Sequence, residues 1–146
     1  MELRHATAAE QAPIHALLAR CALPTGDLAE ARVDFVVAVE GDRLVGAVGL
    51  QQFGDTGLLR SLAVEESARG AGIGARLVRA LEALARERGL RQLVLLTQTA
   101  EAFFAGRGYA PIDRQTVPAR VQASAEFRSL CPASATCMTR TLEDAA

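Results

Sequence analysis

Three glycines occupy alternate positions, Gly70, Gly72 and Gly74, immediately before an apolar stretch with the spacing of a helix. Glycine is less favourable than alanine inside a helix by about 1 kcal/mol, so three of them at a helix start need an explanation. The simplest explanation is that they relax the loop that precedes the helix. Two chemical explanations compete with it.

The first chemical explanation is a dinucleotide-binding turn. The segment GAGIGA, residues 70–75, matches the pattern G-x-G-x-x-A letter for letter. That pattern belongs to the first turn of a βαβ unit, with a carboxylate about 20 residues further on, at the end of the next strand. Here the next apolar strand ends in LLTQT, without a carboxylate, and the glycines follow a series of hairpin strands. This context argues against dinucleotide binding.

The second chemical explanation is a loop that binds a diphosphate at the start of a helix. The first backbone N–H groups of a helix have no acceptor within it, and the helix dipole favours an anion there. Glycine allows a phosphate to reach these amides, because a Cβ atom would hold it away. Arg69 precedes the glycines and adds positive charge. We favour this explanation over the other two.

The composition describes an ordinary folded domain. The 146 residues suit one domain spanning 1–146, with 50% apolar and 23% charged residues. A net charge of −1 gives no reason to expect nucleic acid or an acidic membrane as a partner. Three cysteines, an odd number, and a polar start without a signal-peptide core predict free thiols in the cytoplasm.

Apolar periodicity predicts the elements around the glycine loop. Helices are expected at 6–21, 73–89 and 99–108, and strands at 33–39, 43–50, 56–64, 91–97 and 137–142. The short connections between the first three of these strands predict an antiparallel meander. Within the long helix, Glu82 is expected on the solvent side, opposite the apolar stripe. The order predicts an α+β fold, a mostly antiparallel mixed sheet flanked by helices.

From the third meander strand through the long helix, LLRSLAVEESARGAGIGARLVRALEALARERG closely resembles the acetyl-CoA-binding motif of the GNAT N-acetyltransferase superfamily. Arg69, Gly72 and Gly74 match its hallmark R/Q-x-x-G-x-G/A, and strand, loop and helix occur in order. The later AEAFFAGRGY is similar to the second CoA segment, A-x-x-x-Y-x-x-x-G-F. The resemblance extends over nearly the whole chain. Further segments, including LLARCALPTGDL and SLCPASA, resemble the GNAT branch associated with arsenic-resistance operons.

The resemblance implies direct transfer of an acetyl group from acetyl-CoA to an amine. A bulge in the third meander strand would turn the backbone N–H groups of Leu62 and Val64, with Ala63 between them, toward the thioester. It also implies that exposed strand edges pair two copies into a homodimer. The diphosphate would be held by the amides of Arg69, Gly70, Ala71, Gly72, Ile73, Gly74 and Ala75.

Two positions depart from the pattern of this family. Arg60 stands where many members carry a glutamate base, and a guanidinium cannot accept the proton of the amine. Arg60 could bind an anionic group of the substrate, or it could pair with a carboxylate of the protein. Phe104 stands where the family has a tyrosine that protonates the thiolate, so it is expected only as a cofactor contact. Neither a general acid nor a general base is assigned, and Tyr109 is expected in the core.

Hydroxyl and thiol groups near these segments give weaker indications. Thr97 is expected to contact the cofactor, and Thr99 to cap the helix that follows. Cys131 lies directly before a proline at a predicted helix start, where the dipole would lower the pKa of the thiol. It could contact a thiophilic metalloid together with Cys137 or Cys21. Free cysteines are usually buried hydrophobes, and the spacing does not match a zinc site, so no metal is predicted.

The sequence therefore predicts a cytoplasmic, acetyl-CoA-dependent N-acetyltransferase. Arg60 favours a small amine with an anionic group, such as an amino acid or an amino-acid-like toxin. The resemblance to the arsenic-resistance branch adds an organoarsenical amine. The alternative is a CoA-binding sensor without turnover, because the tyrosine and the glutamate of the family are both replaced.

Overall fold

The computed structural model describes residues 1–132 and 134–142. Short helical turns at Ala8–Glu10, Glu66–Ala68, Arg114–Thr116 and Glu126–Leu130 join its main elements, the last of them a π-helical turn. No helix in these ranges is long and apolar enough to cross a membrane. The main elements are β1 (Glu2–His5), α1 (Gln11–Arg20), β2 (Val33–Glu40), β3 (Arg43–Phe53), β4 (Thr56–Val64), α2 (Ile73–Glu87), β5 (Gln92–Thr97), α3 (Glu101–Ala105), β6 (Ala110–Pro111), α4 (Ala119–Gln122) and β7 (Thr136–Thr141).

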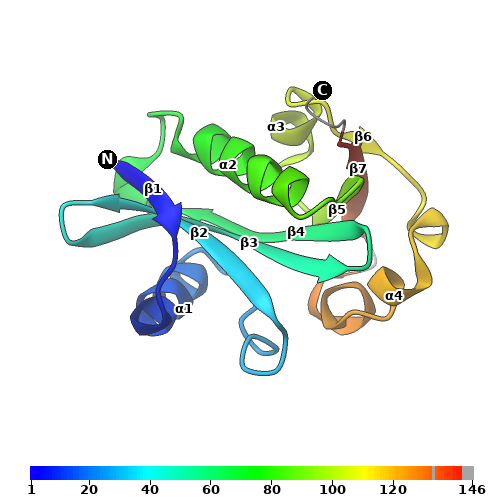
Figure 1. The fold of residues 1–146 in the computed structure, drawn as a ribbon, viewed down its shortest axis with the longest axis horizontal. Coiled ribbons are helices and arrows are strands. Elements are labelled where there is room, and N and C mark those ends of the chain that lie inside the picture. The colour runs from blue at the N-terminus through cyan, green and yellow to red at the C-terminus, as the bar shows by residue number, and fades with distance from the viewer. Residues whose placement is uncertain (133, 143–146) are drawn as a thin grey trace.

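The strands of the described chain form one sheet in the order β1-β2-β3-β4-β5-β7-β6. Only β4 and β5 are parallel neighbours, and the remaining pairs are antiparallel. Helix α2 covers one face of the sheet, and α1 and α4 lie on the other (Figure 1). The predicted meander and the predicted α+β fold are confirmed.

Helix α2 follows the glycine loop and is anchored by its apolar side. It begins at Ile73, after Gly72 with φ at 78°, and it ends just before Gly89 with φ at 74°. Leu77 and Leu81 are fully buried against the sheet, and truncating either would cost about 2–5 kcal/mol. This packing fixes the N-terminus of α2 beside the end of β4.

Strand β4 departs from regular pairing on both of its sides. Against β3, the register places Ser61 and Leu62 opposite Val48 alone, which is a β-bulge, and Ser61 has a φ of 60°. Against β5, the ladder covers only residues 56–58 of β4. Both strands run on past this short ladder, so an opening forms at the carboxyl ends of the parallel pair.

The prediction that Glu82 faces solvent is wrong. Its side chain is buried, and the residue is 3% exposed. The carboxylate accepts a hydrogen bond of 2.8 Å from the Tyr109 hydroxyl and another of 2.8 Å from the Arg140 guanidinium. A buried charge is tolerated when it is paired and hydrogen-bonded in this way. Tyr109 itself is buried, as predicted.

The helix predicted at 99–108 is much shorter, because α3 covers only Glu101–Ala105. The residue at its N-cap position is Ala100, not Thr99, so the prediction for Thr99 is wrong. The Ala100 N–H donates at 2.9 Å to the hydroxyl of Thr97, which therefore closes the turn between β5 and α3.

Candidate active site

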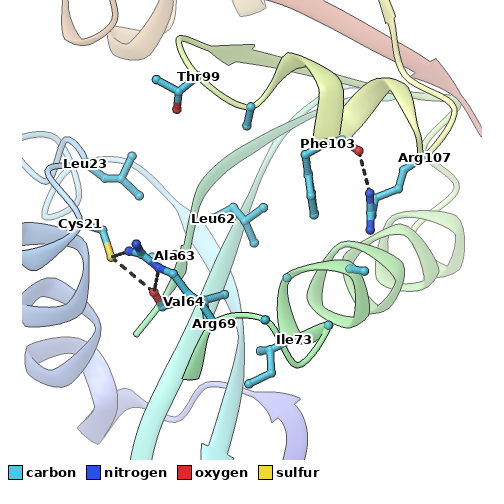
Figure 2. A pocket seen from close by; sticks show the side chains of 15 residues that line it. Cys21, Leu23, Leu62, Ala63, Val64, Arg69, Ile73, Thr99, Phe103 and Arg107 are labelled. Atoms are coloured by element: carbon cyan, nitrogen blue, oxygen red, sulfur yellow. Dashed lines mark hydrogen bonds between the residues drawn. The ribbon is translucent and has the colours of Figure 1, made fainter. Parts of the chain in front are cut away.

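A groove of about 710 Å³ lies between the end of β4, the glycine loop and α3 (Figure 2). Most of the residues predicted to hold a cofactor line this groove. Ala71, Thr97 and Phe104 are not part of the lining. The predicted residues that do line it are Leu62, Ala63, Val64, Arg69, Gly70, Gly72, Ile73, Gly74 and Ala75.

The glycine loop leaves the start of α2 open to the groove. Gly70 and Gly72 have φ values of 90° and 78°, in the region that L-residues rarely adopt, and a Cβ atom on either would meet no protein atom within 4 Å. The Arg76 N–H donates to the carbonyl of Gly72, whereas the three N–H groups before it have no acceptor within the helix. Space, donors and the helix dipole therefore all suit a diphosphate.

Arg69 is held at the wall of the groove. Its Nε donates at 3.0 Å to the carbonyl oxygen of Val64, and its Nη2 lies 3.7 Å from the sulfur of Cys21. Figure 2 shows the side chain lying close to both residues. The contact ties the glycine loop to the end of β4 and places a positive charge beside the open amides.

The end of β4 forms the neighbouring wall. Leu62, Ala63 and Val64 line the groove directly after the bulge. A bulge leaves one residue of the ladder unpaired and redirects the backbone, so an N–H group here is available to a ligand. This geometry suits a carbonyl oxygen that gains negative charge during acyl transfer.

Phe103 and Arg107 line the groove and were missed by the sequence analysis. The Arg107 guanidinium carbon lies 3.9 Å from the centre of the Phe103 ring, and Nη1 donates at 2.8 Å to the Phe103 carbonyl. In the described chain, the buried Nε of Arg107 has no hydrogen-bond partner. Phe104 instead points into the core, where its ring lies 5.4 Å from that of Tyr109. Nothing in the sequence distinguishes the directions in which two adjacent phenylalanine side chains point.

A second pocket, of about 400 Å³, lies where β4 and β5 separate. It shares several residues with the groove, among them Leu62 at the bulge and Thr99 before α3. Thr97 and Phe104 line this second pocket. The two spaces therefore meet at the bulge of β4.

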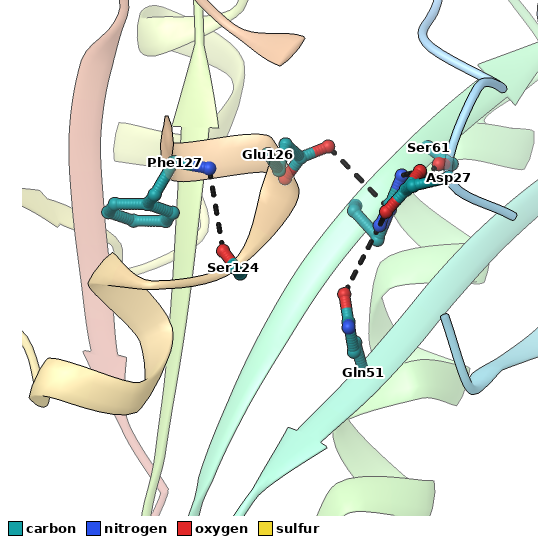
Figure 3. Close-up of polar contacts among 7 residues, drawn as sticks. Asp27, Gln51, Ser61, Ser124, Glu126 and Phe127 are labelled. Atoms are coloured by element: carbon teal, nitrogen blue, oxygen red, sulfur yellow. Dashed lines mark hydrogen bonds and ion pairs between the residues drawn. The ribbon is translucent and has the colours of Figure 1, made fainter. Parts of the chain in front are cut away.

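Arg60 lies in the second pocket and is paired with a carboxylate of the protein. Its Nη1 and Nη2 each donate at 2.7 Å to one oxygen of Asp27, and Nη1 also donates at 3.1 Å to Gln51. The Nε lies 3.7 Å from Oε1 of Glu126. The sequence left open whether Arg60 binds the substrate or pairs with a carboxylate of the protein. The structure shows that it pairs with Asp27. Figure 3 shows Asp27, Gln51 and Glu126 converging on one point beside Ser61.

The pKa values of the two carboxyl groups of this cluster shift in opposite directions. The hydrogen bonds from Arg60 hold the pKa of Asp27 below its ordinary value. Burial raises the pKa of Glu126 to about 7, with Arg60 opposing this rise and Asp27 adding to it. Glu126 therefore changes its charge near neutral pH, whereas Asp27 stays ionised.

Of the two possibilities for Cys131, the structure supports a partly buried thiol and not one whose pKa is lowered. Cys131 follows the π-helical turn, and the Ala135 N–H donates to the Pro132 carbonyl in a turn that leads to β7, so the expected helix start is absent from the described residues there. Burial, and then the charge of Glu126, raise the pKa of the Cys131 thiol to about 11. Burial also raises the pKa of Cys137.

Comparison with known proteins places this arrangement in a family. The model described as "Acetyltransferase (GNAT) family" matches residues 3–109. The chain belongs to the GNAT acetyltransferase family. Acyl transfer is the activity of this family, and acetyl-CoA is its cosubstrate. No curated protein matches the sequence significantly.

Solved structures share the GNAT fold of this chain. N-acetylglutamate synthase from Neisseria gonorrhoeae, in complex with coenzyme A and N-acetyl-glutamate, has a TM-score of 0.84 at 22% identity over 97% of this chain. This GNAT chain spans only 35% of the length of that relative. Rv2747 from Mycobacterium tuberculosis, in complex with CoA, has a TM-score of 0.82 at 28% identity, covering 98% of this chain and 100% of that one. An aminoglycoside 6'-N-acetyltransferase complexed with coenzyme A has a TM-score of 0.73 at 21% identity, covering 100% and 99%.

Proposed function

We propose that this GNAT protein transfers an acetyl group from acetyl-CoA to the amine of a small molecule by direct attack. The observation that carries the proposal is the junction of the groove and the second pocket at the bulge of β4. A thioester held in the groove would present its carbonyl carbon to an amine in the pocket. Holding the two reactants together supplies a large part of the acceleration in such reactions.

The backbone supplies the proposed binding and polarising groups. Amides of residues 69–75 hold the diphosphate at the start of α2, with Arg69 adding positive charge beside them. The N–H groups of Leu62 and Val64 donate to the carbonyl oxygen of the thioester, which is the reactive bond that acetyl-CoA supplies when bound. Preorganised donors of this kind contribute several kcal/mol to the stability of the transition state.

The charge of the second pocket bears on the acceptor. Asp27 neutralises the Arg60 guanidinium and Glu126 adds a carboxylate to the lining, so this cluster attracts the ammonium end of an acceptor more than a carboxylate. An amino-acid-like acceptor would therefore place its carboxylate away from Arg60. The proposal requires only that the acceptor carries an amine. As a narrower proposal, the acceptor also carries an anionic group, as in an amino acid or an organoarsenical amine of the arsenic-resistance branch.

Three further proposals concern the domain extent, the location and the assembly of the protein. Strand β7 lies beyond the family match yet pairs with β5, so we propose that residues 1–146 form one GNAT domain. Cys21, Cys131 and Cys137 are free thiols, which supports a cytoplasmic location. The edge strands β1 and β6 support a homodimer formed by strand pairing.

The test is thiol release from acetyl-CoA across a panel of amines. The panel pairs each amino acid with its decarboxylated amine and adds glutamate, an aminoglycoside and an organoarsenical amine. Turnover with any member is the expected result, and a preference within a pair decides whether the acceptor carries an anionic group. Saturable binding of CoA without turnover across the panel would contradict the enzyme and support a CoA-binding sensor.

A further inference from the structure

Glu126 reaches the second pocket from a part of the chain far from the glycine loop. It opens the π-helical turn Glu126–Leu130, and the residue is 5% exposed. Its carboxylate points toward Asp27 and Ser61 across the opening between the strands (Figure 3). Among the described residues that line the pocket, Glu126 is the one carboxylate. The pocket is also lined by Ser61 and Leu62, the two residues of the bulge.

An amine acceptor in this pocket must lose protons before and during acetyl transfer. A primary amine is mostly protonated at neutral pH and must lose a proton before its nitrogen attacks a carbonyl carbon. Arg60 cannot accept that proton, because a guanidinium stays charged. Asp27 is occupied on both oxygens by Arg60 and is not part of the pocket lining. A carboxylate that lines the pocket remains at Glu126.

From this placement we infer that Glu126 is the general base of the reaction, which accepts the proton of the acceptor amine. The inference rests on the proposed acetyltransferase function. As the C–N bond forms between the amine nitrogen and the acetyl carbonyl carbon, the C–S bond breaks. Glu126 takes one proton from the ammonium form before the attack and later releases it to solvent. The nitrogen releases its second proton to solvent as the C–N bond forms, and the sulfur leaves with the electron pair of the C–S bond and takes a proton from solvent.

The surroundings of Glu126 suit a base that works near neutral pH. Arg60 faces it from β4, Asp27 lies behind Arg60, and Cys131 follows on the same segment. The two 2.7 Å bonds to Asp27 hold the guanidinium, and the contact of Glu126 with its Nε is longer, at 3.7 Å. Burial raises its pKa to about 7. A base with a pKa near the working pH combines a populated ionised form with a strong tendency to take the proton.

The test compares pH profiles of kcat/KM for the natural protein, Glu126→Gln and Glu87→Gln. Glutamine keeps the shape of the side chain but cannot accept the proton. Glu87 is the exposed last residue of α2 and lines neither the groove nor the second pocket, so it serves as the matched control. We expect the natural protein and Glu87→Gln to gain activity up to a pH of about 7 and then level off. Glu126→Gln should lose about 10²- to 10⁴-fold at pH 7 and recover steadily toward high pH.

Two measurements separate the base role of Glu126 from the binding of CoA. Calorimetry with CoA should give the same affinity for Glu126→Gln as for the natural protein, because the groove is unchanged. A Glu126→Gln profile that overlies the natural one, or a natural profile without a limb near pH 7, would overturn the base role while the acetyltransferase function stands. CoA binding without turnover in the natural protein would overturn the proposed function and the base role together.

Discussion

A guanidinium and two carboxylates form one charged cluster beside the second pocket. Asp27, Arg60 and Glu126 come from distant segments, and only the folded sheet brings them together. Arg60 was recognised as unusual, yet its two possible roles could not be separated without its partner. Glu126 lies outside every motif found in the sequence, so nothing marked it. For Cys131, the burial of the thiol could not be weighed against nearby charges without the fold, and burial raises its pKa.

At the residue scale, the burial of Glu126 predicts an unusual dependence of stability on pH. The pKa of Glu126 rises from an ordinary 4.5 to about 7 on folding, mainly through burial. Between these values the folded protein holds a proton that the unfolded chain has lost, so the free energy of unfolding falls as the pH rises from 4.5 through 7. The full effect is about 3 kcal/mol.

Denaturant unfolding of the natural protein and Glu126→Gln at pH 5 and pH 8 measures this effect, with Glu87→Gln as the control. Glu126→Gln stays neutral and should lose that part of the pH dependence, whereas Glu87→Gln should keep it. Identical pH dependence in all three proteins would show that the Glu126 carboxyl is not held in a buried environment.

At the scale of elements, the glycine loop and α2 could be predicted from the sequence. The side-chain directions in α3, within the second CoA segment, could not. The glycines, the apolar stripe of α2 and Gly89 at its end are local signals, and each was found in place. In contrast, α3 has only five residues, so its periodicity could not tell that Phe103 faces the groove and Phe104 the core. Glu82 was misplaced because its partners lie far along the chain.

The two ends of α2 offer a controlled test of the glycine loop. Gly72 and Gly89 both have positive φ, and a Cβ atom at either meets nothing within 4 Å. Alanine at either position should therefore lower the free energy of unfolding similarly, by about 1–2 kcal/mol. Only Gly72→Ala places a methyl group in the groove, so only this variant should weaken CoA binding, by about tenfold or more. Equal CoA affinity for Gly72→Ala and Gly89→Ala would contradict the role of the loop.

At the scale of the whole molecule, the architecture of the sheet creates the site. The meander holds β4 on one side, and the short parallel ladder with β5 lets the two strands separate at their carboxyl ends. Helix α2 then aims its N-terminus at the end of β4. The meander and the five longer strands could be predicted, because apolar runs and turns are local. The bulge was implied only by the family resemblance, and the separation of β4 from β5 was not predicted.

The most direct test of the account is a calorimetric titration of the protein with CoA and, separately, with pantetheine, which lacks the diphosphate. The amides at the start of α2 are proposed to hold that diphosphate, and a helix N-terminus with open N–H groups favours such an anion. We expect saturable binding of CoA at one site per chain and binding of pantetheine at least about tenfold weaker, a difference of about 1.4 kcal/mol. Absence of CoA binding, or equal affinity for the two ligands, would contradict the account.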